Sequence, residues 1–296
     1  RDARVCNLSY AQTDWYIYQQ QCPLYNAPGL PISWNKNQYQ EGTNEYVAVR
    51  PELKKQIEEL YRKHPEEARD SFGEDPFEVK NILKYWVFSE KPEFHVIPTD
   101  TINIHIDKDA LLRSGIMLPK TIRHLKGEDL KDAIPDKLYI PLTDIRMLTK
   151  VDLLMLEMLA NCNWERPLYL AISVGSVSKL KFDNYFVQEG LAFRFTPFDY
   201  KKWGDVGENR LYAVDVERLY DNVMNRYKYG GLDTPGLYLD ETTLRTCWYH
   251  RRLFAQLAKE LIAQGDNERA KKVLAYAEQV IPGYNVPETH ESGSYD

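Results

Sequence analysis

The chain contains no apolar run of about 18 residues, the length that crosses a bilayer as a helix. It also lacks a recognisable secretory leader. A predicted strand over residues 4–8 begins almost at the first residue, so we expect the chain to be a piece of a longer protein. If so, the missing targeting signals say little about where the protein is located.

The chain has few cysteines and no net positive charge. The four cysteines, Cys6, Cys22, Cys162 and Cys247, lie far apart without a CxxC pair, which argues against a zinc site. Buried thiols and one or two long-range disulfides both stay open. The formal net charge is −6 with both signs spread along the chain, which argues against a nucleic-acid partner because such proteins present a basic face.

Familiar catalytic motifs are missing as well. There is no GxSxG, GxxxxGK[ST], GxGxxG or HExxH motif, so we expect no catalytic residue and no cofactor in this chain. One segment offers possible metal ligands, because His105, Asp107 and Asp109 would share one face of a strand. Either aspartate can equally cap a helix that starts at Ala110, and we therefore expect no metal.

The composition and the hydrophobic pattern predict a folded α/β protein. Hydrophobic residues make up 43% and charged residues 28%. A strand is expected over residues 45–49, and a helix follows from Pro51. Thr149 caps an apolar helix with Asp152 three residues on, and residues 168–174 read as a buried strand. A helix between two apolar runs suggests a strand–helix–strand unit and hence a layered α/β body.

The C-terminal part is helical. Helices are predicted from Asp240 to Gln264 and over about 267–280. Their small and apolar residues fall at the spacings of a tetratricopeptide repeat: Leu257, Ala258, Leu261, Gly265, Ala270, Leu274, Ala277 and Pro282. We therefore expect a layered α/β body over residues 1–235, a tetratricopeptide-like helical hairpin over 236–286, and a disordered tail over 287–296. The hairpin is either a plain helical cap or a peptide-binding groove.

Residues 161–168 place much polar chemistry between the apolar helix and the next strand. An arginine near a sheet seeks a carboxylate, so Arg166 is predicted to pair with Glu165 or Glu189. Asn161 and Asn163 are expected to satisfy the backbone of the turn. On this interpretation the segment is a structural joint.

The alternative is a polar pocket at a sheet edge, a common position for ligand sites in α/β folds. On the first interpretation Trp164 covers the joint. The candidate binding residues are Trp164, Arg166, Glu189, Arg194 and Trp15.

Three segments together resemble a known family. They are residues 7–17 (NLSYAQTDWYI), residues 163–169 (NWERPLY) and residues 189–194 (EGLAFR). Their order and spacing are similar to the C-terminal soluble region of a bacterial family of multi-pass membrane proteins of unknown function. That family is related to the transmembrane protein O-mannosyltransferases, which also end in tetratricopeptide-like helices.

The resemblance implies a location and a role. The domain would lie on the extracytoplasmic, periplasmic side of the cytoplasmic membrane, where its cysteines can oxidise. It would be a non-catalytic accessory domain of a glycosyltransferase-like membrane protein, because the catalytic acidic residues of such proteins belong to the membrane part. Its partners would be an acceptor polypeptide or glycan and the transmembrane domain of the parent protein. The alternatives are a free-standing carbohydrate-active enzyme and an assembly scaffold.

Overall fold

The computed structural model describes residues 3–174, 180, 182–207 and 212–287. They form two compact units, which we call unit 1 (Arg1–Leu168 with Val174–Phe182) and unit 2 (Tyr169–Ser173 with Asp183–Asp296). The predicted division at residue 235 is a different one and stays a prediction, and the predicted tail lies outside the described residues from 288 onward. Among the described helices none has both the length and the apolarity to cross a membrane.

Unit 1 contains two small sheets. In the first, β1 (Tyr46–Val49) is the central strand, with β2 (Val96–Ile97) parallel on one side and β5 (Met147–Thr149) antiparallel on the other. The second is an antiparallel pair of β3 (Thr101–His105) and β4 (Lys137–Pro141). The strand predicted over residues 45–49 is thereby confirmed.

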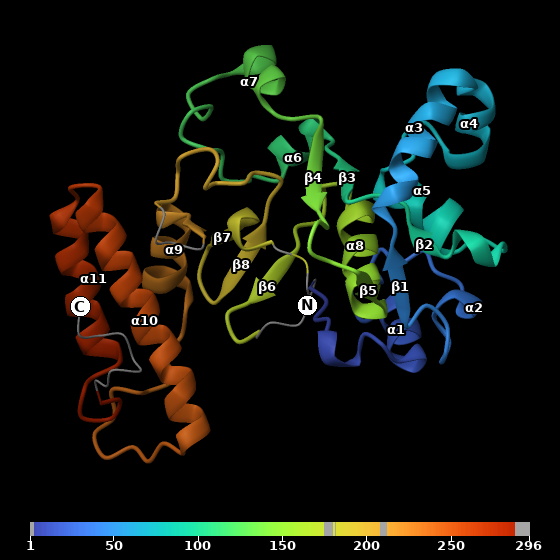
Figure 1. Ribbon diagram of the computed structural model, residues 1–296. Helices are drawn as coiled ribbons and strands as arrows, with labels where there is room; N and C mark the ends of the chain where they lie inside the picture. The colour runs from blue at the N-terminus through green and yellow to red at the C-terminus, as the bar shows by residue number, and fades with distance from the viewer. Residues whose placement is uncertain (1–2, 175–179, 181, 208–211, 288–296) are drawn as a thin grey trace. The chain divides into compact units, whose positions relative to one another are not determined.

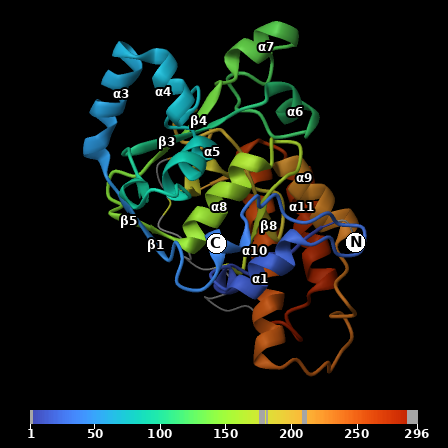
Figure 2. The ribbon, with the colours of Figure 1, turned by 90° about the vertical axis from the view of Figure 1, so that its right-hand side faces the viewer.

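Helices connect these strands. In chain order they are α1 (Asp14–Gln21), α2 (Lys36–Tyr39), α3 (Lys54–Lys63), α4 (Pro65–Phe72), α5 (Val79–Ile82), α6 (Lys108–Arg113), α7 (Gly127–Ala133) and α8 (Lys150–Asn161). A π-helical turn (Leu83–Val87) continues α5. The pair α3 and α4 stands away from the sheets of the unit, as both views show (Figure 1 and Figure 2).

Helix α8 is the centre of unit 1. Its apolar sequence buries Leu153 and Leu154 completely, and the helix contacts α5, β3 and β5. The predicted capping box is present: the Asp152 amide donates to Thr149 Oγ1 over 3.3 Å, and the Thr149 amide donates to the Asp152 carboxylate over 2.9 Å. Local polar chemistry therefore begins this helix, and burial of its apolar residues holds it in place.

Unit 2 has one mixed sheet in the order β6-β8-β7-β9. The strands are β6 (Tyr169–Ala171), β7 (Phe186–Gln188), β8 (Ala192–Phe195) and β9 (Ala213–Val214). The helices are α9 (Val216–Asp221), which a π-helical turn (Asn222–Arg226) continues, α10 (Glu241–Ala263) and α11 (Asn267–Val280).

The last two helices pack side by side as an α-hairpin (Figure 1), which confirms the predicted helix pair. Ala258 and Ala270 are buried, so small residues lie in the core of the pair. Gly265 has φ +81°, a conformation that glycine adopts without strain, and lies in the turn between the helices. The tetratricopeptide relation itself stays a prediction.

His250 of α10 makes unit 2 sensitive to pH. Its ring lies edge-on to Tyr227 and Tyr229, with centroids 5.8 and 5.4 Å away, and its Nδ1 is buried without a hydrogen-bond partner among the described residues. Burial lowers the pKa of His250 from its ordinary value of 6.5. The unfolded chain therefore binds the proton more readily, so the free energy of unfolding falls as the pH drops through that value.

We expect His250→Phe to flatten this pH dependence. Urea unfolding of both proteins between pH about 8 and about 5.5 measures the difference in slope. His64→Phe is the control, because His64 is exposed and should leave the slope of the parent chain unchanged. Equal slopes for the parent chain and His250→Phe would contradict the expectation.

Three predictions about the strands are wrong. Residues 4–8 contain no strand, and a 3-10 turn (Leu8–Tyr10) capped by Asn7 begins there instead. The strand predicted as buried over 168–174 is only Tyr169–Ala171, and it is partly exposed because it is an edge strand. The strands before and after α8 belong to different sheets, so there is no strand–helix–strand unit.

The cysteine chemistry left open by the sequence is now defined. All four cysteines are free thiols, with Cys162 and Cys247 buried and Cys6 and Cys22 partly buried. Burial raises the pKa of Cys162 and of Cys247, which makes the reactive thiolate less accessible at neutral pH.

Candidate functional site

The elbow after α8, which we define as residues 161–168, is built on two left-handed residues. Asn163 has φ 48° and Trp164 has φ 61°. Asparagine adopts this conformation readily, but it is uncommon for a bulky residue and costs free energy that other contacts must offset. For Trp164 these contacts are burial, with 6% of the residue exposed, and an indole Nε1 that donates to the His105 carbonyl over 2.8 Å.

Arg166 ties the elbow to a distant loop. Its Nη1 donates to the Gly29 carbonyl over 2.7 Å and its Nη2 to the Pro28 carbonyl over 3.3 Å. The predicted pair with Glu165 or Glu189 is therefore wrong. The Glu165 carboxylate lies 3.9 Å from Arg113 instead, and the acceptors that Arg166 uses are main-chain carbonyls.

The two asparagines of the elbow also act differently from the prediction. Asn161 Nδ2 donates to the Pro31 carbonyl over 3.3 Å, so it satisfies the backbone of another loop and not of its own turn. Asn163 Oδ1 accepts from Lys80 Nζ over 3.2 Å. The elbow is thus both a structural joint, through Trp164 and Arg166, and a rim that offers polar groups.

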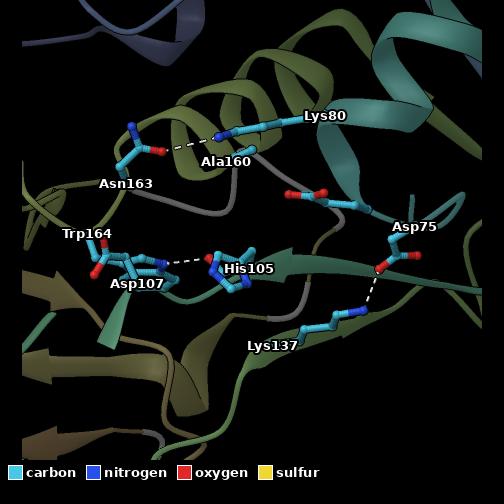
Figure 3. A pocket seen from close by; sticks show the side chains of 9 residues that line it. Asp75, Lys80, His105, Asp107, Lys137, Ala160, Asn163 and Trp164 are labelled. Carbon is cyan, nitrogen blue, oxygen red and sulfur yellow. Dashed lines mark hydrogen bonds and ion pairs between the residues drawn. The ribbon is translucent and has the colours of Figure 1, made fainter. Parts of the chain in front are cut away.

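A polar pocket of about 240 Å³ opens beside the elbow, within unit 1 (Figure 3). Its volume lies just below the roughly 300–1,000 Å³ that is usual for small-molecule sites, so it suits one small polar unit. The lining residues come from several elements: Asp75, Glu78, Lys80, His105, Asp107, Lys137, Ala160, Asn163 and Trp164.

Strand pairing brings these residues together. His105 ends β3 and Lys137 begins β4, and the two are partners in the antiparallel register. Glu78 precedes α5 and forms a bridge with Asn103 of β3. Lys80 then reaches from α5 across to Asn163, as Figure 3 shows. The pocket is therefore assembled by tertiary structure and not by one sequence motif.

One ion pair forms a wall of the pocket. Lys137 Nζ lies 2.7 Å from Asp75 Oδ2, and the Phe77 amide donates to Asp75 Oδ1 over 3.0 Å. Burial pushes the pKa of Asp75 upward, but the hydrogen bonds from Lys137 and from the Phe77 amide outweigh it and lower the pKa overall. The same hydrogen bond, which Lys137 donates to Asp75, raises the pKa of Lys137. Both groups therefore stay charged at neutral pH.

Other groups face the pocket with their bonding capacity unused. Within the described residues, neither the Glu78 carboxylate nor the His105 ring forms a hydrogen bond or an ion pair. Among the residues that the structure describes, the only hydrogen-bond partner of the Lys80 ammonium group is the neutral Asn163 amide. The pocket thus presents hydrogen-bond acceptors and donors close together, with carboxylates and ammonium groups nearly balanced.

Asp107 caps a helix, which was one of the two alternatives predicted for it; the other was a metal ligand. It precedes α6, and its carboxylate accepts from the Ala110 amide over 2.9 Å. Asp109 pairs with Lys131 over 2.7 Å and does not line the pocket. Since His105 ends a strand and Asp107 begins a helix, the expected shared strand face does not exist. The described residues contain no cluster of three metal-ligating side chains.

The candidate binding residues are divided among different places. Only Trp164 lines the pocket, while Arg166 braces the elbow and Trp15 lies exposed on α1. Glu189 and Arg194 belong to unit 2, where they are brought together. Their predicted role in binding stays a prediction.

Glu189 is the centre of a buried cluster in unit 2. Its Oε1 lies 3.1 Å from Arg218 Nη1 and 3.7 Å from Arg194 Nη1, and its Oε2 accepts from the Tyr169 hydroxyl over 2.8 Å. Glu189 and Arg194 side chains are 8% and 3% exposed. The Glu189 carboxylate accepts hydrogen bonds from Tyr169 and Arg218 and forms an ion pair with Arg194. At this depth it braces the sheet, because it neutralises charge that water does not reach.

Sequence reasoning missed four residues of the pocket: Asp75, Glu78, Lys80 and Lys137. They are separated along the chain and carry no motif, and Glu78 and Lys80 look like ordinary solvated charges. Two segments near the pocket did carry a sequence signal: His105–Asp107, which was considered for a metal, and residues 161–168, for which a polar pocket was one of the two alternatives.

The chain was compared with known protein families, curated proteins and solved structures. The family model described as TMEM260-associated domain 2 matches residues 1–217 of the chain. No curated protein and no solved structure matches the chain.

Proposed function

The chain belongs to the TMEM260-associated domain 2 family, and from this premise we propose that it is a non-catalytic accessory domain that holds an acceptor for a glycosyltransferase-like membrane protein. The description of the family ties the domain to a membrane protein, in line with the resemblance seen in the sequence. The extracytoplasmic location, the relation to O-mannosyltransferases and the transmembrane partner are parts of the proposal. The acceptor is a polypeptide or a glycan, and the pocket chemistry favours a glycan unit.

The balance of charges in the pocket carries this proposal. An anionic ligand would face the carboxylates of Asp75, Glu78 and Asp107, and a cationic ligand would face Lys80 and Lys137. A neutral ligand rich in hydroxyl groups suits both sets, because each hydroxyl group donates one hydrogen bond and accepts others. A single sugar residue has this chemistry and fits a pocket of small volume.

A carbohydrate-active enzyme is the second candidate, because three carboxylates line the pocket. Such an enzyme needs two opposed carboxyl groups, one of which stays protonated to donate its proton. Asp75 does not suit that role, because its pKa is lowered and Lys137 holds it in the charged form. Asp107 is committed to capping α6. Binding without bond cleavage therefore fits the pocket better.

Isothermal titration with a panel of methyl glycosides tests the proposal. We expect one or more neutral glycosides to bind, and Glu78→Gln and Lys80→Met each to weaken binding about tenfold, since a hydrogen bond to a charged group contributes roughly 1.5–3 kcal/mol. Glycosides that carry a carboxylate or an amine should bind more weakly than neutral ones.

Matched controls lie close by in the sequence. Lys84→Met changes an exposed lysine one helical turn from Lys80 that does not line the pocket. Glu74→Gln changes an exposed carboxylate paired with Arg69. Both should bind as the parent chain does. If no glycoside binds, or if the pocket variants and the controls bind equally well, the proposal is wrong.

A further inference from the structure

Uncharged aromatic side chains gather near the N-terminus of the chain. Residues 3–34 contain only two charged residues, Arg4 and Asp14, whereas charged residues make up 28% of the whole chain. The same segment exposes six large apolar or aromatic side chains: Val5, Tyr10, Trp15, Tyr18, Leu24 and Tyr25. Such a surface is unlike the charged, solvated faces of α3 and α4.

Three of these rings lie on one face, which we call the aromatic strip: Tyr10, Trp15 and Tyr18. Trp15 and Tyr18 are three residues apart on α1 and therefore share a side of the helix. The Tyr10 ring lies 6.1 Å from the Trp15 ring. The three residues are 51%, 57% and 62% exposed, while Tyr16 beneath them is buried and contacts both Tyr10 and Trp15.

Packing and hydrogen bonds support part of the strip. The Thr13 hydroxyl donates to the Tyr10 carbonyl over 2.7 Å, and the Asn7 amide donates to the hydroxyl of the buried Tyr16 over 2.6 Å. Because the Tyr10 and Trp15 rings both contact the Tyr16 ring, these two rings are supported before any partner arrives, which reduces the entropy lost on binding.

The chemistry of the strip selects among possible partners. A polyanion would need lysine or arginine, and the strip has neither. A glycan chain stacks on flat, continuous faces, but the Tyr10 and Trp15 planes of the strip are inclined by 47°. The headgroup region of a bilayer favours tryptophan and tyrosine, whose apolar rings carry a polar tip and need no coplanar arrangement.

We propose that the aromatic strip lies in the interfacial region of a lipid bilayer and docks the domain on the membrane surface. The family's tie to a membrane protein provides a bilayer close by. This contact is separate from the pocket and from the proposed function of the domain. Because the strip is uncharged and the whole chain has a net charge of −6, its binding does not depend on anionic lipid.

Flotation of the 296-residue chain with phosphatidylcholine vesicles tests the proposal. We expect the chain to float with the vesicles, and Trp15→Ala and Tyr18→Ala each to weaken partitioning by roughly tenfold, because each removes a half-exposed ring from the interface. Tyr238→Ala is the control, because Tyr238 is 87% exposed and lies outside the strip. Circular dichroism verifies that the variants are folded. If Trp15→Ala does not fold, Tyr18→Ala alone tests the proposal.

Two further conditions separate this contact from electrostatic attraction. Adding phosphatidylserine should not strengthen partitioning, and raising the salt concentration should not weaken it. The proposal is overturned if the chain fails to float, if both strip variants partition like the Tyr238 control, or if partitioning depends on phosphatidylserine and falls with salt.

Discussion

Replacing Glu189 by alanine is expected to lower the free energy of unfolding by about 3–5 kcal/mol, the usual effect of removing one partner from a buried ion pair. Arg194, whose side chain is 3% exposed, would lose the carboxylate that neutralises it, and the Tyr169 hydroxyl would lose its acceptor. Urea unfolding followed by circular dichroism measures the loss. Glu189→Gln keeps the shape and removes the charge, so it should lie between alanine and the parent chain.

The control is an ion pair of the same kind at the surface. Glu241 lies 3.2 Å from Arg245 on α10, and both side chains are largely exposed. Glu241→Ala should lower the free energy of unfolding by less than about 1 kcal/mol, because solvent screens exposed pairs. A Glu189→Ala loss as small as this would mean that the cluster does not brace the sheet.

Replacing Trp164 by alanine should lower the free energy of unfolding by about 3–5 kcal/mol and abolish ligand binding in the pocket. The substitution removes a buried indole, its hydrogen bond to the His105 carbonyl and one wall of the pocket. Trp164→Phe keeps an aromatic ring and should retain most of the packing, while the lost hydrogen bond costs about 1 kcal/mol. Thermal unfolding and titration of the three proteins separate the two effects.

Trp15→Ala is the matched control for stability, because it makes the same chemical change at an exposed position. It should lower the free energy of unfolding by less than about 1 kcal/mol. If Trp164→Ala unfolds like the parent chain and only ligand binding disappears, the elbow is a binding element and not a structural joint.

Features that depend on nearby residues could be predicted from the sequence. The capping box of Thr149 and Asp152, the ends of α10 and α11, and glycine at the turn of the hairpin follow from the chemistry of a few adjacent positions. The α/β class was also predicted correctly, although the strand–helix–strand unit from which it was inferred does not exist.

Features that depend on residues far apart in the chain could not be predicted from the sequence. Arg166 was assigned a carboxylate because opposite charges attract, yet its acceptors are two carbonyls more than 130 residues away, whose direction depends on how the loop folds. The pocket depends on the register between His105 and Lys137 and on the bridge at Glu78. No short turn joins β3 to β4, so the residues next to the strands do not set this register.

Chemical-shift mapping by NMR of the isotope-labelled chain, titrated with the neutral methyl glycosides, tests the central claim most directly. The account predicts shifts concentrated at Glu78, Lys80, His105 and Asn163, together with a glycoside concentration that stays constant over time. Shifts confined to other surfaces, or release of free sugar during the titration, would contradict it.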